Sequence, residues 1–169
     1  MKLRPAVVTD IPLLKAWDEN PYVIDATGED SDYDWSEEIP RTADWGELLI
    51  AEEGGRPIGF MEIIDPAREP TRYWGDVENN LRALDIWIGE EKDLGRGYGT
   101  QMMRLALACC FAEPGVKAVI IDPLERNIRA RRFYERLGFR FVEIRTFEKE
   151  VCAIYRLERA DYERLAVAR

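Results

Sequence analysis

Three glycines alternate along the segment Leu94–Thr100, after a run of strand-forming residues and before an amphipathic stretch. The preceding run, Leu84–Ile88, predicts a strand, and apolar residues at three- and four-residue spacings predict a helix from about Gly97 to Ala112. Glycines let several peptide N–H groups approach one point, and the start of a helix adds free N–H groups and partial positive charge. The segment therefore indicates either a phosphate-binding turn or a tight strand-to-helix connection.

Two nucleotide-binding motifs with similar glycine spacing do not match this turn. A P-loop has a lysine followed by Ser or Thr after its last glycine, whereas Gly99 is followed by Thr100 and Gln101. A Rossmann turn lies early in a repeating strand-helix array, with an acidic residue about 20 positions further on. Here the turn lies past the middle of the chain, and Asp122 comes too late to fit.

A second motif begins at Asn127. Asn127, Ala130, Tyr134 and Leu137 recur on one side of a predicted helix, and Gly138 follows as a helix-ending residue before a new apolar run.

Together, the two motifs resemble the GNAT superfamily of N-acetyltransferases over roughly Leu84–Phe139. The resemblance implies an α/β fold with a central mixed β-sheet flanked by helices on both faces, and acetyl-CoA as cosubstrate. Leu94 departs from the superfamily, which usually has Gln or Arg there. Aminoglycoside 6′-N-acetyltransferases share this leucine and are the most similar group, although acetyltransferases of other amines show the same pattern. Further matches to that group lie at Leu3-Arg4, Gly59-Phe60, Asp85 and Asp122-Pro123.

The resemblance implies how acetyl-CoA would be held. Its pantetheine arm would enter between the Leu84 strand and a predicted strand at Lys117–Ile121, the glycine turn would bind the pyrophosphate, and the Asn127 helix would flank the thioester. The implied acetyl-CoA-binding residues are Ile86, Trp87, Ile88, Leu94, Gly95, Arg96, Gly97, Tyr98, Gly99, Thr100, Asn127, Ala130, Arg131 and Phe133.

Asp85 and Tyr134 are the predicted catalytic residues. Asp85 interrupts an apolar strand, which is costly if the carboxylate is buried without a purpose, although simple alternation could instead point it to solvent. The resemblance implies that Asp85 orients the amine and accepts its proton. It also implies that Tyr134 protonates the departing sulfur; a half-buried core tyrosine is the alternative.

Several further residues are candidates for binding the acceptor. Asp122 ends the predicted central strand, where open α/β sheets bind ligands, although it could also brace the following loop. Tyr73 and Trp74 could form an aromatic wall. The remaining acidic candidates are Asp76, Glu62 and Glu150.

Charge is distributed unevenly along the chain. Residues before Ala83 carry 19 acidic and 8 basic side chains, and those from Ala83 onward carry 14 and 16, within a net charge of −9. The first half therefore suits a cationic small molecule and disfavours nucleic acid. Its acidic segment Asp25–Glu38 either contacts the ligand or forms a solvated, mobile loop.

Composition excludes several kinds of chemistry. The chain has no histidine, so Ser-His and Cys-His nucleophilic systems and histidine-containing metal sites are excluded, and no metal is expected. Three cysteines do not indicate a disulfide framework. Without a long apolar run or a signal-like stretch, we expect one domain over residues 1–169, located in the cytoplasm without a membrane partner, as a monomer or homodimer.

Further elements are predicted from capping, turn and alternation signals. They are a strand at Leu3-Arg4, a helix capped by Thr9-Asp10 and running to about Trp17, a hairpin of Leu48–Glu52 and Pro57–Ile64 across Gly54-Gly55, closing strands at Phe139–Phe147 and Val151–Leu157, and a helix from about Asp161.

The leading hypothesis is an acetyl-CoA-dependent N-acetyltransferase acting on a polycationic small molecule, first of all an aminoglycoside in antibiotic resistance. An alternative acceptor is a polyamine, a siderophore precursor or another metabolite amine. A noncatalytic acyl-CoA-binding module is the alternative of another class. The presence of both Asp85 and Tyr134 argues against that module.

Overall fold

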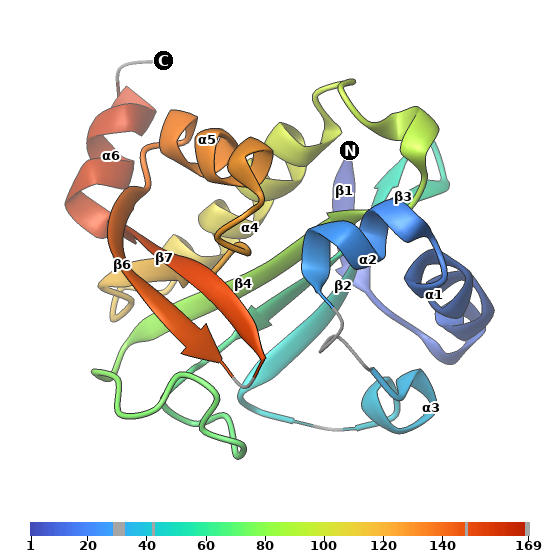
Figure 1. The fold of residues 1–169 in the computed structure, drawn as a ribbon, viewed down its shortest axis with the longest axis horizontal. Coiled ribbons are helices and arrows are strands. Elements are labelled where there is room, and N and C mark those ends of the chain that lie inside the picture. The colour runs from blue at the N-terminus through green and yellow to red at the C-terminus, as the bar shows by residue number, and fades with distance from the viewer. Residues whose placement is uncertain (29–32, 42, 148, 168–169) are drawn as a thin grey trace.

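A seven-stranded mixed sheet runs through the molecule in the order β1-β2-β3-β4-β5-β7-β6 (Figure 1). The computed structural model describes residues 1–28, 33–41, 43–147 and 149–167. The strands are β1 (Lys2–Pro5), β2 (Gly46–Glu53), β3 (Arg56–Ile64), β4 (Leu81–Ile88), β5 (Ala118–Ile121), β6 (Arg140–Phe147) and β7 (Glu150–Glu158). The helices are α1 (Ile11–Asp18), α2 (Pro21–Thr27), α3 (Trp35–Glu38), α4 (Tyr98–Ala112), α5 (Ile128–Arg136) and α6 (Arg159–Val167), with 3-10 turns η1 (Val8–Asp10) and η2 (Glu91–Asp93).

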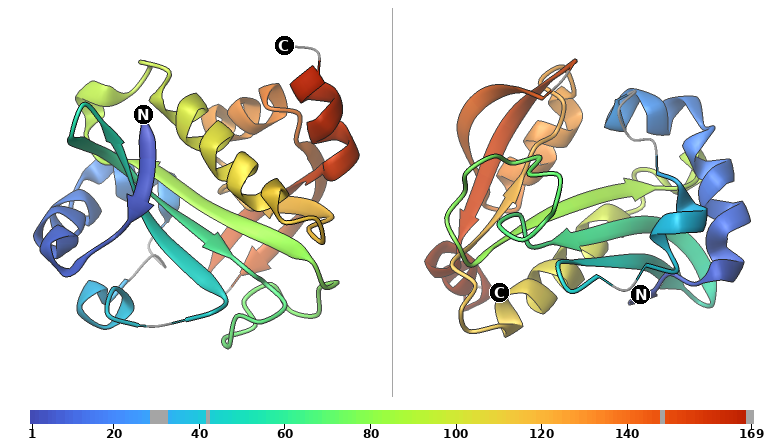
Figure 2. Two further views of the ribbon diagram at one scale, coloured as in Figure 1. Left: turned by 180° about the vertical axis from the view of Figure 1, so that it is seen from behind. Right: turned by 90° about the horizontal axis from the view of Figure 1, so that it is seen from below.

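The sheet opens between β4 and β5. These parallel strands pair only from Leu81 opposite Ala118 to Ala83 opposite Ile120, whereas β4 stays paired with β3 as far as Ile88. In the right-hand view of Figure 2, β6 and β7 turn away from the strands on the other side of the opening. The expected separation of the two strands is therefore confirmed.

The register of β3 and β4 decides which peptide groups face the opening. The N–H of Gly89 donates to the Ile58 carbonyl at 2.9 Å, and hydrogen-bonded pairs in an antiparallel ladder recur at every second residue. Asp85 and Trp87 therefore use their peptide groups toward β3. The peptide groups of Ile86 and Ile88 point toward the opening.

Helices cover both faces of the sheet, as the sequence predicts. One face packs Met61 and Leu84 against the buried side of α4, including Met102 and Ala106. The opposite face carries an aromatic cluster shared with the helices α1 to α3. Its central members are Trp17, Trp35, Phe60 and Trp87.

Most predicted strands lie where the sequence places them. The hairpin turn at Gly54-Gly55 has φ angles of 59° and 81°, which glycine tolerates without strain.

No helix among the described residues is long and apolar enough to cross a bilayer.

The predicted cap of the first helix is wrong in its detail. Asp10 makes no side-chain hydrogen bond to the start of α1. Its carboxylate instead accepts two hydrogen bonds from Arg4, at 2.7 and 2.8 Å, and one from the Val7 amide at 2.9 Å. A charge-assisted bidentate pair is stronger than a single cap, so Asp10 ties the helix to β1.

The acidic segment Asp25–Glu38 is only partly described, because residues 29–32 lie outside the described residues. Its described ends belong to α2 and α3, and Trp35 is fully buried and stacked on Tyr33 with ring centroids 4.5 Å apart. The expectation of a solvated loop is therefore wrong for this end of the segment, which is anchored in the aromatic cluster.

Replacing Gly89 with alanine should destabilise the fold. An alanine Cβ at this position would lie 1.9 to 2.3 Å from indole atoms of the buried Trp17. Such overpacking is expected to lower the free energy of unfolding by about 3 kcal/mol in urea titrations. Gly115→Ala is the control, since its Cβ would meet only an Asn80 oxygen at 3.9 Å. Equal losses for both variants would contradict this packing.

Candidate functional site

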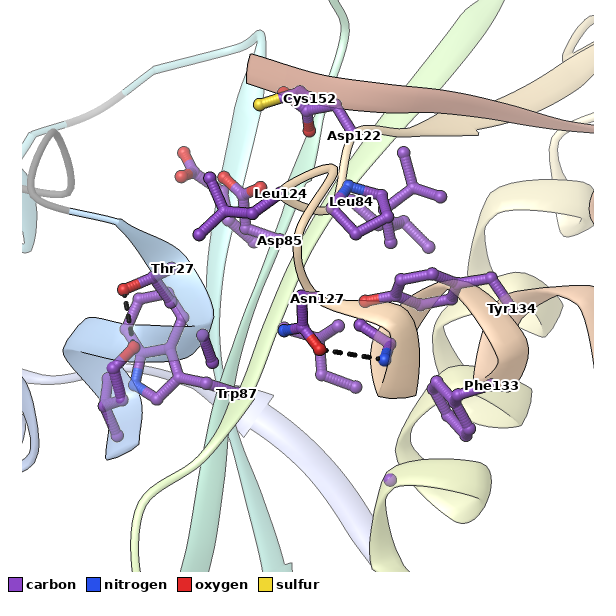
Figure 3. A pocket seen from close by; sticks show the side chains of 18 of the residues that line it. Thr27, Leu84, Asp85, Trp87, Asp122, Leu124, Asn127, Phe133, Tyr134 and Cys152 are labelled. Atoms are coloured by element: carbon purple, nitrogen blue, oxygen red, sulfur yellow. Dashed lines mark hydrogen bonds between the residues drawn. The ribbon is translucent and has the colours of Figure 1, made fainter. Parts of the chain in front are cut away.

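A cavity of about 900 Å³ occupies the opening between β4 and β5 (Figure 3). Its walls come from β3, β4, α2, the glycine turn, α5, β7 and the loop before β4. Most of the predicted site residues line it. They are Glu62, Tyr73, Trp74, Asp85, Ile86, Trp87, Ile88, Leu94, Gly95, Gly97, Gly99, Thr100, Asp122, Asn127, Ala130, Phe133, Tyr134 and Glu150.

Four predicted residues do not line the cavity: Arg96, Tyr98, Asp76 and Arg131. The Arg131 side chain donates to the Tyr155 hydroxyl at 3.2 Å and to the Glu125 carbonyl at 3.1 Å, so it braces α5 against the sheet. Asp76 has a fully exposed side chain in the loop before β4. Helical spacing alone could not separate Arg131 from Arg129, which does line the cavity.

The glycine turn forms one end of the cavity. Gly97 lies just before α4 with a φ of 80°, a left-handed conformation that favours glycine. The turn is anchored by an ion pair that sequence reasoning missed. Arg56 donates two hydrogen bonds, at 2.6 and 2.8 Å, to the buried Asp93, and these bonds hold the pKa of that carboxyl below its usual value. Because Asp93 ends η2, the pair fixes the chain immediately before the glycines.

The groups at this end fit an acyl-CoA. The strand edge offers the N–H groups of Ile86 and Ile88 and the Ile86 carbonyl to an extended amide-containing arm, as in strand addition, while the Ile88 carbonyl accepts the Tyr22 hydroxyl. The Phe133 ring packs next to Gly99 at the start of α4. A Cβ added at Gly99 would lie 3.6 Å from that ring. The Asn127 side chain caps α5, because its Oδ1 atom accepts a 3.0 Å hydrogen bond from the Ala130 amide (Figure 3). No cluster of three metal-ligating side chains occurs in the part of the chain that the structure describes.

The other end of the cavity is acidic. Glu62 on β3 is paired in register with Asp85 on β4, so both carboxylates project from the same face of the sheet. Asp122 follows β5, and its carboxylate accepts a hydrogen bond from Tyr73 at 2.7 Å. Three of the predicted carboxylates are therefore brought together, although they come from three different strands or strand ends.

A tyrosine that the sequence analysis did not single out joins two of these carboxylates. The Tyr33 hydroxyl lies 2.9 Å from Glu62 Oε2 and 3.2 Å from Asp85 Oδ2. Its ring is held between Trp35, Phe60 and Trp87 in the aromatic cluster. No local pattern around Tyr33 indicates this role, because both partners lie far along the chain.

Burial makes these groups hold their protons tightly. Burial, with the charge of Asp85 second, raises the pKa of Glu62 to about 8. Burial also raises the pKa of Asp85, and it raises the pKa of Asp122 to about 8 with a further contribution from Asp85. The site thus keeps closely spaced carboxyl groups whose charged forms a bound cation would favour.

Tyr134 reaches the same cavity from the opposite face of the sheet. It projects from α5 toward β4, with its hydroxyl directed into the cavity (Figure 3). Burial raises its pKa above the ordinary tyrosine value, with the charge of Asp85 adding to the effect. The hydroxyl makes no hydrogen bond to another described residue, so it is available to a ligand.

The family model for a GNAT acetyltransferase domain matches residues 6–147. This chain belongs to the GNAT acetyltransferase family. The match spans the sheet opening, the glycine turn and α5, so it includes both ends of the cavity.

Curated relatives differ in how much of their length is matched. Aminoglycoside N(6')-acetyltransferase type 1 of Klebsiella pneumoniae is 31% identical over 91 residues, which are 53% of this chain and 45% of that protein. Lysine N-acyltransferase MbtK of Mycobacterium tuberculosis is 27% identical over 164 residues, covering 92% of this chain and 76% of that protein.

A solved structure shares the same fold over nearly the whole chain. The aminoglycoside acetyltransferase AAC(6')-Ib, solved in complex with coenzyme A and kanamycin, superposes with a TM-score of 0.87 at 23% identity, covering 98% of each chain. The predicted fold class is therefore confirmed.

The free energy of unfolding should fall as pH rises because of Glu62. Its pKa is about 8 in the folded protein and near the ordinary value of 4.5 in the unfolded chain. Between these values the folded state binds more protons, and one such proton contributes about 1.4 kcal/mol per pH unit. In urea titrations from pH 5 to 8, Glu62→Gln should show a shallower fall than the parent. Glu47→Gln, at an exposed site on β2, should not. Identical slopes for all three proteins would contradict this assignment.

Valine at Gly99 should weaken acetyl-CoA binding without unfolding the protein. A single Cβ there meets Phe133 and Ile88 only at ordinary contact distances, whereas a branched side chain would project over the amides that start α4. We expect the calorimetric Kd to rise by about tenfold or more, an energy of roughly 1.4 kcal/mol, with Gly99→Ala intermediate. Unchanged affinity in a folded Gly99→Val protein would place the cofactor elsewhere.

Proposed function

We propose that this chain is an acetyl-CoA-dependent N-acetyltransferase for a small polycationic amine, with an aminoglycoside 6′-amino group as the first candidate. The observation that carries the proposal is the set of carboxyl groups at the acceptor end of the cavity, where Glu62 is buried and Asp85 and Asp122 are half-buried. Carboxyl groups whose pKa values are raised by burial suit a ligand that brings several positive charges, because a bound cation favours their charged forms. The named activities of the relatives support the same class of reaction.

The chemistry assigned to the residues follows from their places around the opening. When bound, acetyl-CoA supplies an activated thioester, held by the peptide groups of Ile86 and Ile88 and by the glycine turn. Asp85 orients the ammonium group and accepts its proton, because an ordinary ammonium is neutral in only about one molecule in 10³ at pH 7. Tyr134, from the other face, donates a proton to the sulfur as the thiol leaves.

The remaining lining residues are assigned to the acceptor. Tyr73 stacks on Phe147 with ring centroids 4.3 Å apart and presents a half-exposed ring beside Asp122. The buried Trp74 packs edge-on against the Tyr73 ring, with ring centroids 5.7 Å apart. Glu150 pairs with Arg126 at 2.9 Å and closes the side of the cavity near Gly28. The proposed activity depends on acetyl-CoA, so we expect it to operate in the cytoplasm.

A second candidate acceptor is a lysine-like or siderophore-precursor amine. The lysine N-acyltransferase relative matches more of this chain than the aminoglycoside enzyme does. The two proposals differ in the number of positive charges on the acceptor. A noncatalytic acyl-CoA-binding module is disfavoured by the free Tyr134 hydroxyl.

One experiment separates these possibilities: CoA release by the purified protein, measured against a panel of amines. Turnover with kanamycin-like compounds is expected. Turnover only with monoamines or amino acids would favour the second candidate. Acetyl-CoA binding without turnover on any amine would contradict the proposed enzyme.

Phenylalanine at Tyr134 should slow the reaction while sparing cofactor binding. The ring would keep its packing on Phe133 and Phe139, and only the proton donor would be lost. We expect kcat to fall by about 100-fold, with the Kd for acetyl-CoA changed less than about twofold. Tyr162→Phe, whose ring packs on Phe111 away from the cavity, is the control and should keep full activity. A Tyr134→Phe enzyme within twofold of the parent would return this tyrosine to a packing role.

A further inference from the structure

Tyr33 lies between two carboxyl groups that alternation along the strands places side by side. Its hydroxyl is within hydrogen-bond distance of both Glu62 and Asp85. Ordinary pairing of like charges across neighbouring strands is unfavourable. A hydroxyl placed between the two acids makes the arrangement tolerable and connects them chemically.

The hydrogen-bond inventory limits the protonation states of this group. A tyrosine hydroxyl can donate one hydrogen bond and accept others. Tyr33 can donate to Glu62 and at the same time accept from Asp85 only if Asp85 carries a proton. The reverse arrangement needs the proton on Glu62. Both bonds are therefore satisfied once the two carboxyls hold one proton between them, which is the state reached after an acceptor gives its first proton to Asp85, and Tyr33 can pass that proton on.

The proposed reaction requires two protons to leave the acceptor nitrogen. An ammonium group has three N–H bonds, and the secondary amide that it becomes has one. A lone Asp85 could hold only the first of these protons and would then be unable to accept the second. The reaction therefore benefits from a second acidic group that takes the first proton away.

We propose that Tyr33 and Glu62 form a proton relay that removes the first proton from Asp85 during acetyl transfer. Asp85 can then accept the second proton of the same amine. This inference rests on the proposed function. Asp85 touches the amine and is the catalytic base; Tyr33 and Glu62 act through it.

A bound cationic acceptor favours the charged forms of the two acids, so both begin as carboxylates and Tyr33 donates to Glu62. The ammonium transfers a proton to Asp85, Asp85 passes a proton to the Tyr33 oxygen, and Tyr33 releases its own proton to Glu62. Asp85 is again a carboxylate and accepts the second proton as the N–C bond forms and the C–S bond breaks. Tyr134 protonates the sulfur and then takes up one of the two protons that left the acceptor nitrogen. The other proton is released to solvent.

The surroundings of Glu62 suit the end of a relay. Burial favours its protonated form, and Asp85 and Glu38 add negative charge that acts in the same direction. Arg41 opposes them only weakly, since its Nη2 atom lies 3.9 Å from Glu62 Oε1 and its guanidinium stacks over Trp45. On the side of Asp85, the further titratable groups that its charge affects are Asp122, Tyr73 and Tyr134, which all line the same cavity.

The test compares acceptors of different basicity in the variants Tyr33→Phe, Glu62→Gln and the double variant. Tyr33→Phe keeps the ring packing on Trp35 and Phe60 and removes only the hydroxyl. For a strongly basic amine we expect kcat/KM to fall by about 100-fold in each single variant. The double variant should be no worse than either single one, because either substitution breaks the same relay.

The relay should matter little for a weakly basic acceptor such as a hydrazide, which enters already neutral and has only one proton to lose. There we expect Tyr33→Phe to lie within about threefold of the parent. In mixtures of H₂O and D₂O, a plot of kcat/KM for the basic amine against the D₂O fraction should be curved for the parent and linear for Tyr33→Phe. Tyr22→Phe, which removes another lining hydroxyl, one bonded to the Ile88 carbonyl, should affect both acceptors by the same factor.

The outcomes separate the relay from the proposed function. Equal losses for strongly and weakly basic acceptors, or additive losses in the double variant, would overturn the relay while leaving the acetyltransferase intact. Absence of parental turnover with every amine would overturn the proposed function and the relay with it.

Discussion

The early end of pairing between β4 and β5 is the constraint on which the site depends. A continuous sheet would keep the residues of its two faces apart. Here the opening begins after Ala83, so Asp85 from one face and Tyr134 from the other border the same cavity. The same opening leaves the peptide groups of Ile86 and Ile88 without a neighbouring strand. One departure from regular pairing thus creates both the strand edge and the meeting place of acid and base.

Charge is sorted along this cavity. The end near the glycine turn offers backbone amides, and Arg129 and Arg136 on α5 also line the cavity. The opposite end holds the buried Glu62 and the half-buried Asp85 and Asp122, and the pKa values of all three carboxyl groups are raised. Burying such groups costs stability unless each has a partner. Tyr33 and Tyr73 supply these partners, and the aromatic cluster beneath them supplies the rigid support that holds Tyr33 in place.

The sequence predicts the parts of the fold that local signals specify. The glycine turn, its flanking strand and helix, the Gly54-Gly55 hairpin and the capped helix after Asn127 all follow from short-range patterns, and each lies within a few residues of its expected place. The placement of Asp85 and Tyr134 at one cavity came from family resemblance, since periodicity alone leaves Asp85 free to face solvent and Tyr134 as a core residue.

What could not be predicted depends on long-range contacts. Tyr33 is 29 residues from Glu62 and 52 from Asp85, and nothing in its neighbourhood distinguishes it from other tyrosines. Asp10 looks like a helix cap but is taken by Arg4, because a bidentate ion pair outcompetes a single amide. Arg131 shares its helix with Arg129, and only packing against Tyr155 shows that its side chain is already committed.

Amide hydrogen exchange at β4 tests the central claim most directly. Without ligand, the amides of Ile86 and Ile88 face the opening, whereas those of Asp85 and Trp87 are bonded to β3. Adding acetyl-CoA should slow exchange at Ile86 or Ile88 strongly and change Asp85 and Trp87 much less. If saturating acetyl-CoA protects neither Ile86 nor Ile88 in the folded protein, the opening between β4 and β5 is not the cofactor slot.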